Sequence, residues 1–135
     1  MLNELISRIN AQKDFSILFA EDEEMIRRPM LALIKRICPN TIAAVDGVEA
    51  WEMYQEHKFT VVITDLMMPN MNGAQLVQHI RKQNPNQVII VLTAYKECDV
   101  LKEAQVYGID YLLSKPLFLG EFIEIIKEII TKMDA

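Results

Sequence analysis

Charged and hydroxyl side chains follow short apolar runs at four places in the sequence. Glu21 and Asp22 come directly after the first run, and Asp65 follows the third. Thr93 follows the fourth run, and Lys115 comes soon after the fifth. Clustered carboxylates repel one another unless a cation lies among them. Mg²⁺ favours one or two carboxylates together with water and phosphate oxygens. These residue types predict a divalent-cation site that can receive a phosphoryl group.

The same set indicates what the site would do. A phosphoryl group on Asp65 would carry roughly two negative charges. The metal ion would neutralise one side of it, Lys115 another, and the hydroxyl of Thr93 could donate a hydrogen bond. Phosphoryl transfer depends mainly on positioning and charge stabilisation, and a carboxylate is an established nucleophile for it. We therefore predict an aspartyl-phosphate site centred on Asp65.

Alternating strand and helix patterns must bring these residues together. The apolar runs cover residues 15–20, 41–45, 60–64, 88–92 and 109–113, and a helical pattern follows each. Continuous apolar runs are typical of strands buried on both faces, and their alternation with helices favours right-handed βαβ units. We predict an α/β fold, a doubly wound parallel sheet of five strands in the order 2-1-3-4-5. That order places the first and third strands side by side, about 4.8 Å apart.

The first fourteen residues precede this pattern. Leu2, Leu5, Ile6 and Ile9 have the i, i+3, i+4, i+7 spacing of an amphipathic helix. We divide the chain into a helical extension, residues 1–14, and a main domain, residues 15–135. The extension either packs on the domain or frays, or else it serves as a dimerisation or linker segment.

Composition excludes several classes of protein. The chain has 135 residues, is 51% hydrophobic and carries a net charge of −5, which fits one globular domain without direct nucleic-acid or anionic-membrane binding. No apolar stretch is long enough to span a membrane, and no secretory leader is expected. Cys38 and Cys98 are too few for a disulfide framework, so we expect reduced thiols and a cytoplasmic protein. No glycine-rich phosphate loop is present, and His57 and His79 lack ligand-type neighbours at metal-site spacing.

Four motifs, in order, carry a resemblance. They are ILFAED, VVITDLMMPNMNG, VIIVLTA and YLLSKP. With them the chain resembles, over about residues 15–133, the receiver domains of two-component response regulators, the family of the bacterial chemotaxis regulator. Residues 65–73 fit the family's phosphoacceptor pattern, D-x-x-M-P-x-M-[DN]-G, in full. The resemblance implies a flavodoxin-like receiver fold.

The resemblance also implies roles. Asp65 would be phosphorylated, Glu21 and Asp22 would be the paired acids, and Asp22 would be the direct metal ligand of the pair. The backbone carbonyl of Met67 would complete the protein ligands of Mg²⁺ or Mn²⁺. Thr93 would be the switch hydroxyl and Lys115 the phosphate-contacting lysine. The family usually has a cis bond at the position of Lys115–Pro116, whereas only about 5–6% of X–Pro bonds are cis.

Two departures from the family pattern concern regulation. The family often has an aromatic residue three positions before the lysine, where this chain has Leu112, with Tyr111 one position away. Either Leu112 replaces the aromatic residue or a bulge restores Tyr111, because adjacent strand residues face opposite sides. Met67 and Tyr95 each come two residues after a site residue. We expect these bulky side chains to restrict the attacking water and to lengthen the phosphorylated lifetime.

The implied partners are proteins. A histidine kinase or a histidine phosphotransfer protein would supply phosphohistidine, and a downstream protein or a fused output domain would receive the signal. The chain is expected to be either a stand-alone regulator or part of a longer protein. A homodimer is possible, with Ile125 and Ile129 at the margin of the last helix as its surface. The domain would be a signalling module, not an enzyme, that assists its own phosphotransfer and slow autodephosphorylation.

Two other functions stay open at this point. A phosphate-independent interaction module of the same fold would need neither Asp65 nor Lys115, yet both are present. A Mg²⁺-dependent phosphatase with an aspartate nucleophile would, by resemblance, have an acid two residues after it, where Met67 stands.

Overall fold

A computed structural model describes residues 2–12, 14–94 and 98–134. The described residues form an initial helix followed by five strands that alternate with five further helices. The strands are β1 (Ile17–Ala20), β2 (Thr41–Ala44), β3 (Val61–Asp65), β4 (Val88–Thr93) and β5 (Tyr111–Ser114). The helices are α1 (Leu2–Ala11), α2 (Glu24–Ile37), α3 (Gly47–Glu56), α4 (Gly73–Gln83), α5 (Asp99–Tyr107) and α6 (Leu119–Asp134).

The five strands form one parallel sheet in the order β2-β1-β3-β4-β5. This confirms the predicted doubly wound α/β fold and its strand order. Ala20, the last residue of β1, pairs with Thr64, so β1 and β3 end at the same level. The residues that follow them therefore emerge together at one edge of the sheet.

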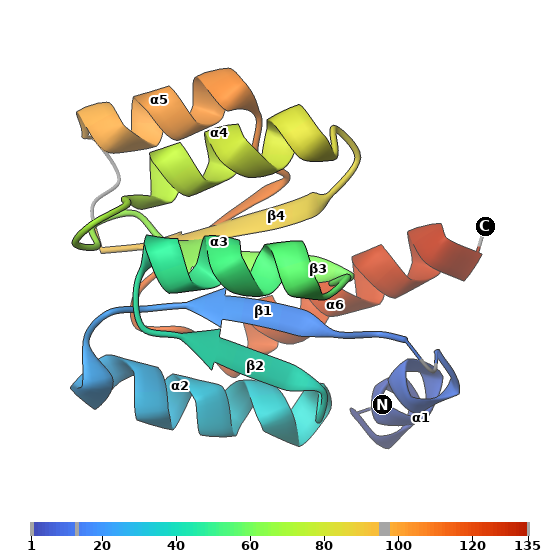
Figure 1. Ribbon diagram of the computed structural model, residues 1–135. Coiled ribbons are helices and arrows are strands. Elements are labelled where there is room, and N and C mark those ends of the chain that lie inside the picture. Colours follow the sequence, from blue (N-terminus) through green and yellow to red (C-terminus); the bar gives the residue numbers. More distant parts are fainter. Residues whose placement is uncertain (1, 13, 95–97, 135) are drawn as a thin grey trace.

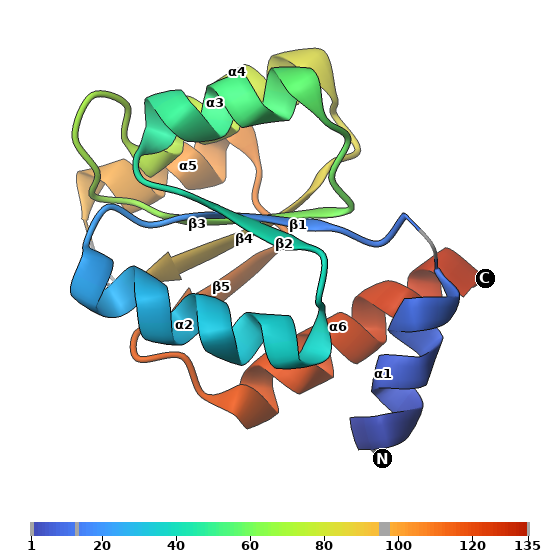
Figure 2. The same cartoon turned by 60° about the horizontal axis from the view of Figure 1, so that its bottom comes forward.

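Helices cover both faces of the sheet. Helices α2 and α6 lie on one face, and α3, α4 and α5 lie on the other (Figures 1 and 2). Successive strand side chains point to opposite faces, so Phe19 and Ile63 join one apolar cluster while Leu18 and Val62 join the other. Burial on both faces is the reason why these strands are continuously apolar.

Helix α1 packs on the domain beside α6 (Figure 2). Leu5 and Ile9, one helical turn apart, are only 2% and 3% exposed and belong to the same apolar cluster as α2 and α6. On its polar side, Arg8 pairs with Asp134 at 3.0 Å, and Gln12 donates to the same carboxylate at 3.0 Å. The extension is therefore built into the core and does not fray.

The outer surface of α6 differs from the expectation. Ile129 is 2% exposed and lies in the core, and Ile125 is partly buried against the same cluster. The sheet and the neighbouring helices cover more of α6 than one narrow stripe, so Ile129 is not available as a dimer or partner surface, whereas the half-buried Ile125 stays a predicted margin residue. None of the described helices is long and apolar enough to cross a membrane.

Candidate functional site

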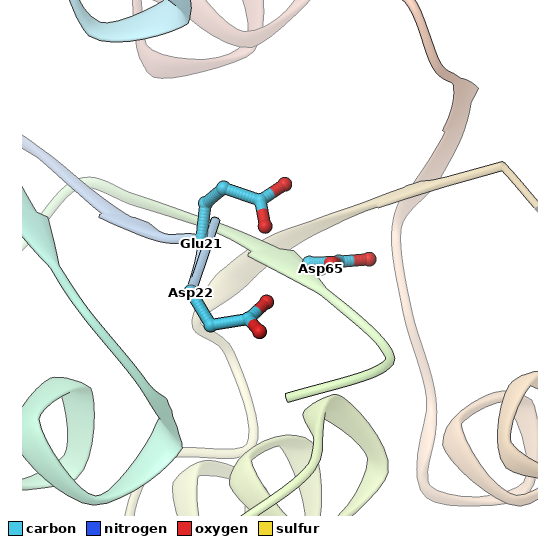
Figure 3. Close-up of side chains that lie close together, drawn as sticks. All are labelled: Glu21, Asp22 and Asp65. Atoms are coloured by element: carbon cyan, nitrogen blue, oxygen red, sulfur yellow. The ribbon is translucent and has the colours of Figure 1, made fainter. Parts of the chain in front are cut away.

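Three carboxylates meet where β1 and β3 end. Glu21 and Asp22 follow β1 directly, and Asp65 is the last residue of β3. Each of the three offers an oxygen, and these oxygens lie within 4.8 Å of one another. Figure 3 shows the three carboxylates directed to the same side of the strand ends. The structure therefore brings together the acidic residues that the sequence singled out.

Lys115 supplies the positive charge of the cluster. It follows β5, and its Nζ lies 2.9 Å from Oδ2 of Asp65 and also donates to Oε1 of Glu21. The lysine side chain is itself largely buried. The Lys115–Pro116 bond is cis, which confirms that expectation. One ammonium group thus bridges carboxylates that come from two different strands.

Burial shapes the electrostatics of this cluster. Removal from water, reinforced by the nearby Asp65 carboxylate, raises the pKa of Glu21 to about 7, against the opposing effect of Lys115. Burial alone would lower the pKa of Lys115, but its hydrogen bonds to Glu21 and Asp65 outweigh that effect and raise it. The cluster carries more negative than positive charge, so an additional cation would be favourable there.

The donor set fits a hard divalent cation. Among the residues that the structure describes, Oδ1 of Asp22 is buried without a hydrogen-bond partner. Such a carboxylate oxygen is costly unless something positive binds it. The three carboxylates offer oxygen ligands only, which suits Mg²⁺ or Mn²⁺ better than softer metals. Met67 lies two residues after Asp65, and its carbonyl stays a predicted fourth ligand.

The loop between β3 and α4 is held close to the end of the sheet. Oδ1 of Asp65 accepts a hydrogen bond from the amide of Leu66 at 2.7 Å. The amide of Gly73 donates to the carbonyl of Leu66 at 2.8 Å, and a Cβ at Gly73 would lie 2.3 Å from the carbonyl oxygen of Asp65. Only glycine permits that approach, which explains the last residue of the phosphoacceptor motif.

A second anchor ties this loop to the start of α3. The side chain of Asn70, which has a φ of 70°, donates to Asp46 at 2.8 Å. Asp46 also accepts from the amide of Glu49 at the N-terminus of α3. A Cβ at Gly47 would lie 2.1 Å from the carbonyl oxygen of Met71. The sequence did not predict this anchor, since the pair Asp46-Gly47 after a strand indicates a turn but not a contact with a distant loop.

Thr93 ends β4, next to the residue paired with Asp65. Its side chain is buried, and its carbonyl accepts a hydrogen bond from the amide of Lys115 at 2.9 Å. Thr93 therefore stands between the phosphoacceptor candidate and the lysine in the order of the strands. The expectation about Tyr95 falls on residues 95–97, which lie outside the described residues.

The position of Leu112 settles the question of a bulge. Tyr111 pairs with Ile90 and Leu112 with Val91 in an unbroken register. Tyr111 packs against the cluster on the α2 and α6 face, while Leu112 lies on the face of Val91 and is 41% exposed. Leu112 therefore replaces the aromatic residue, and Tyr111 points away from that position.

Arg27 is a neighbour of the site that sequence reasoning missed. Its Nη1 donates to the carbonyl oxygens of Glu21 and Asp22, at 2.9 and 3.1 Å. Nothing in its sequence context distinguishes it from Arg28, which pairs with Glu24 at the surface. Its position in the first turn of α2, a few residues after Glu21 and Asp22, is the only feature of the sequence that could have indicated a contact with the site.

Comparison with known proteins agrees with this geometry. The model of the response regulator receiver domain family matches residues 17–127. The chain belongs to this family. Its receiver fold is shared by solved structures. A response regulator receiver domain protein from Clostridium thermocellum is 25% identical with a TM-score of 0.79, covering 89% of this chain and 97% of that one. The chemotaxis protein CheY4 of Vibrio cholerae is 25% identical with a TM-score of 0.77, covering 85% and 98%.

Longer proteins contain similar receiver domains. The transcriptional regulatory protein YesN of Bacillus subtilis is 33% identical over 122 residues, which are 88% of this chain and 33% of YesN. The transcriptional regulatory protein HptR of Staphylococcus aureus is 37% identical over 111 residues, covering 76% and 41%. A cyclic di-GMP phosphodiesterase of Thermotoga maritima is 32% identical over 104 residues, covering 77% and 28%. The receiver domain spans less than half the length of these relatives.

Proposed function

We propose that this receiver domain accepts a phosphoryl group on Asp65 from a phosphohistidine and changes its protein contacts in response. One oxygen of Asp65 attacks phosphorus, the phosphorus–nitrogen bond of the donor breaks, and an acyl phosphate forms. Mg²⁺ or Mn²⁺, held by Glu21, Asp22, Asp65 and the Met67 carbonyl, would neutralise charge during this step. The observation that carries the proposal is the ammonium of Lys115 at 2.9 Å from Asp65, among three converging carboxylates.

The remaining residues have roles in holding the product. Lys115 would keep its charge beside Asp65 and turn from the carboxylate to the phosphoryl oxygens. Thr93 would move its hydroxyl toward a phosphoryl oxygen, which shifts the end of β4 and the loop after it. Because Leu112 replaces the usual aromatic partner, the response would travel through this loop without an aromatic rotation.

Labelling with a small phosphodonor such as acetyl phosphate tests the assignment. With Mg²⁺ we expect one phosphoryl group per chain in the wild type and none in Asp65→Asn. Asp14→Asn is the matched control, because it removes an exposed carboxylate that precedes β1 at the far end of the sheet. No labelling of the wild type would favour a phosphate-independent interaction module. Sustained release of phosphate over many turnovers would instead favour a phosphatase.

The surface beside the site offers contacts for a protein donor. Met25 is 89% exposed in the first turn of α2, and Met67 is half-exposed in the loop after β3. Exposed apolar side chains mark an interaction surface where they lie together in a patch. We propose that a histidine kinase or phosphotransfer protein docks here. Met25→Glu would then slow transfer from the protein donor without changing labelling by acetyl phosphate.

A second apolar surface suits the receiving partner. Val106, Leu112 and Phe118 are exposed on or beside α5, β5 and α6. We propose that a downstream protein, a fused output domain or a second copy of the chain binds here in the phosphorylated state. Sedimentation with and without beryllofluoride, a phosphoryl mimic, would detect a homodimer, and Leu112→Glu would abolish it.

Two further proposals concern the domain boundary and the location of the protein. We keep residues 1–14 as an extension of a receiver domain at 15–135, although the two share one core, because the family match begins only at residue 17. The free thiols of Cys38 and Cys98 support a cytoplasmic location. A shortened chain that begins at residue 15 and still folds, with reduced stability, would support the boundary.

A further inference from the structure

Arg27 occupies an unusual place for a cation. It lies in the first turn of α2, where the helix dipole disfavours positive charge. Its guanidinium is directed back to the end of β1, and a single nitrogen, Nη1, donates to the carbonyl oxygens of both Glu21 and Asp22. We propose that Arg27 is a positioning residue that aims the acid pair at the metal ion. This inference rests on the proposed function of the site.

The acid pair, Glu21 and Asp22, needs a contact that fixes its backbone because the two residues are consecutive. In a strand, adjacent side chains point to opposite faces, so two consecutive carboxylates would normally separate. Here both converge with Asp65, with oxygens within 4.8 Å (Figure 3). The chain must therefore leave the extended conformation after Ala20. Two successive carbonyls that accept from one nitrogen fix the chain in that turned conformation.

Asp22 depends on this contact more than Glu21 does. Glu21 has two further anchors, since its carboxylate accepts from the amide of Glu23 at 3.2 Å and from Lys115. Among the described residues, Oδ1 of Asp22 is buried and without a partner. Its direction is therefore set by the backbone to which it is attached. Arg27 holds that backbone through the carbonyl oxygen of Asp22, at 3.1 Å.

Charge and positioning predict opposite results when Arg27 is replaced. A cation near the carboxylates opposes a second cation, so loss of its charge alone would tighten metal binding. Loss of the two carbonyl contacts would let the acid pair diverge and would weaken metal binding. The direction of the change in affinity therefore distinguishes the positioning role from a purely electrostatic one.

The test compares Arg27→Met with Arg28→Met in the complete chain. Both remove one positive charge from adjacent positions of α2, but Arg28 is exposed and pairs with Glu24 at the surface, at 3.6 Å. Binding of Mn²⁺ alone is measured by electron paramagnetic resonance. Arg27→Met should raise the dissociation constant roughly tenfold, as the loss of an outer contact to a metal site typically does. Arg28→Met should leave it unchanged, and Arg27→Lys should restore part of the affinity.

A kinetic readout separates positioning from a general loss of structure. In labelling by acetyl phosphate, Arg27→Met should need more Mg²⁺ for half-maximal rate and reach the wild-type rate when Mg²⁺ is saturating. Should Arg27→Met fail to fold, Arg27→Gln, which keeps one donor group, is expected to show a smaller loss in the same direction.

Three results would overturn the inference. A folded Arg27 variant that binds Mn²⁺ as tightly as the wild type, or more tightly, contradicts positioning while leaving the proposed function intact. Equal weakening in Arg27→Met and Arg28→Met would assign the effect to the helix as a whole. A wild-type protein that binds no Mn²⁺ would remove the proposed metal site, and this inference with it.

Discussion

The ammonium nitrogen of Lys115 lies 2.9 Å from Oδ2 of Asp65, and the same nitrogen contacts Glu21. All three side chains are largely or fully buried. A buried charge that loses its partner is strongly destabilising, because the partner no longer compensates for lost hydration. The lysine therefore has a structural role in the metal-free protein beyond its proposed contact with phosphate.

Replacing Lys115 should reveal that role. In the presence of a chelator, Lys115→Met should lower the free energy of unfolding by about 3 kcal/mol, because two buried carboxylates lose their counter-charge. Excess Mg²⁺ should recover part of the loss. Urea denaturation measures both effects, and Lys127→Met, which breaks a surface pair with Glu124, is the control. Equal stability of the two variants would contradict this account.

The raised pKa of Glu21 predicts a pH dependence of stability. Its ordinary pKa of 4.5 rises to about 7 on folding, so the folded state holds this proton more tightly than the unfolded chain does. The stability that this proton contributes is complete below about pH 4.5 and is lost as the pH rises through about 7. In the metal-free wild type, relative to Glu21→Gln, we expect a loss of about 1–2 kcal/mol between pH 5.5 and 8.

Urea denaturation of both proteins across this pH range, in a chelator, gives the comparison. The glutamine variant corrects for all other titrating groups, since it lacks only the carboxylate. Mg²⁺ should stabilise the wild type more at pH 8 than at pH 5.5, because the ion competes with the proton for Glu21. A pH-independent difference between the two proteins would show that Glu21 titrates normally.

Helix α1 should contribute to the stability of the whole domain. Leu5→Ala and Ile9→Ala each remove a buried side chain from the cluster shared with α2 and α6, and each should lower the free energy of unfolding by about 2–4 kcal/mol. Leu2→Ala, at a more exposed position of the same helix, should have little effect. If Leu5→Ala and Leu2→Ala have equal stability by urea denaturation, α1 does not contribute to the core in solution.

The lifetime of the phosphorylated state should depend on Met67 and Tyr95. Met67 is half-exposed in the loop after Asp65, where its side chain can restrict the approach of water. Replacing both residues with small polar ones, for example Met67→Asn with Tyr95→Ser, should speed the loss of phosphate from the labelled protein. The measurement is the decay of label after the donor is removed, and an unchanged decay rate rejects the idea.

The sequence was sufficient to predict the sheet because its strands are apolar on both faces. Runs such as residues 61–64 carry no alternation, so burial by helices on both sides followed directly, and the strand order followed from the fold class. The convergence of Asp22, Asp65 and Lys115 then required only that parallel strands end at one edge. These steps depend on periodicity and topology, which the sequence expresses locally.

The parts that sequence could not predict depend on packing between distant elements. On a helical projection Ile129 lies at the edge of the apolar face of α6, yet the sheet and the neighbouring helices bury it. Arg27 reads like Arg28, and only the turn after β1 places carbonyl acceptors within its reach. The choice between Leu112 and Tyr111 needed the register of β5 against β4. Each depends on an angle or a contact that no local pattern encodes.

Arg8 and Gln12 both donate hydrogen bonds to the carboxylate of Asp134, and this contact has a practical consequence for experiments. It brings the end of α1 and the last turn of α6 together on the side of the molecule away from the carboxyl ends of the strands (Figure 1). Fluorophores or affinity tags attached to the last turn of either helix would therefore stay clear of incoming donors. A pair of dyes placed there would report by energy transfer whether the ends of α1 and α6 separate, without disturbing phosphorylation at the carboxyl ends of the strands.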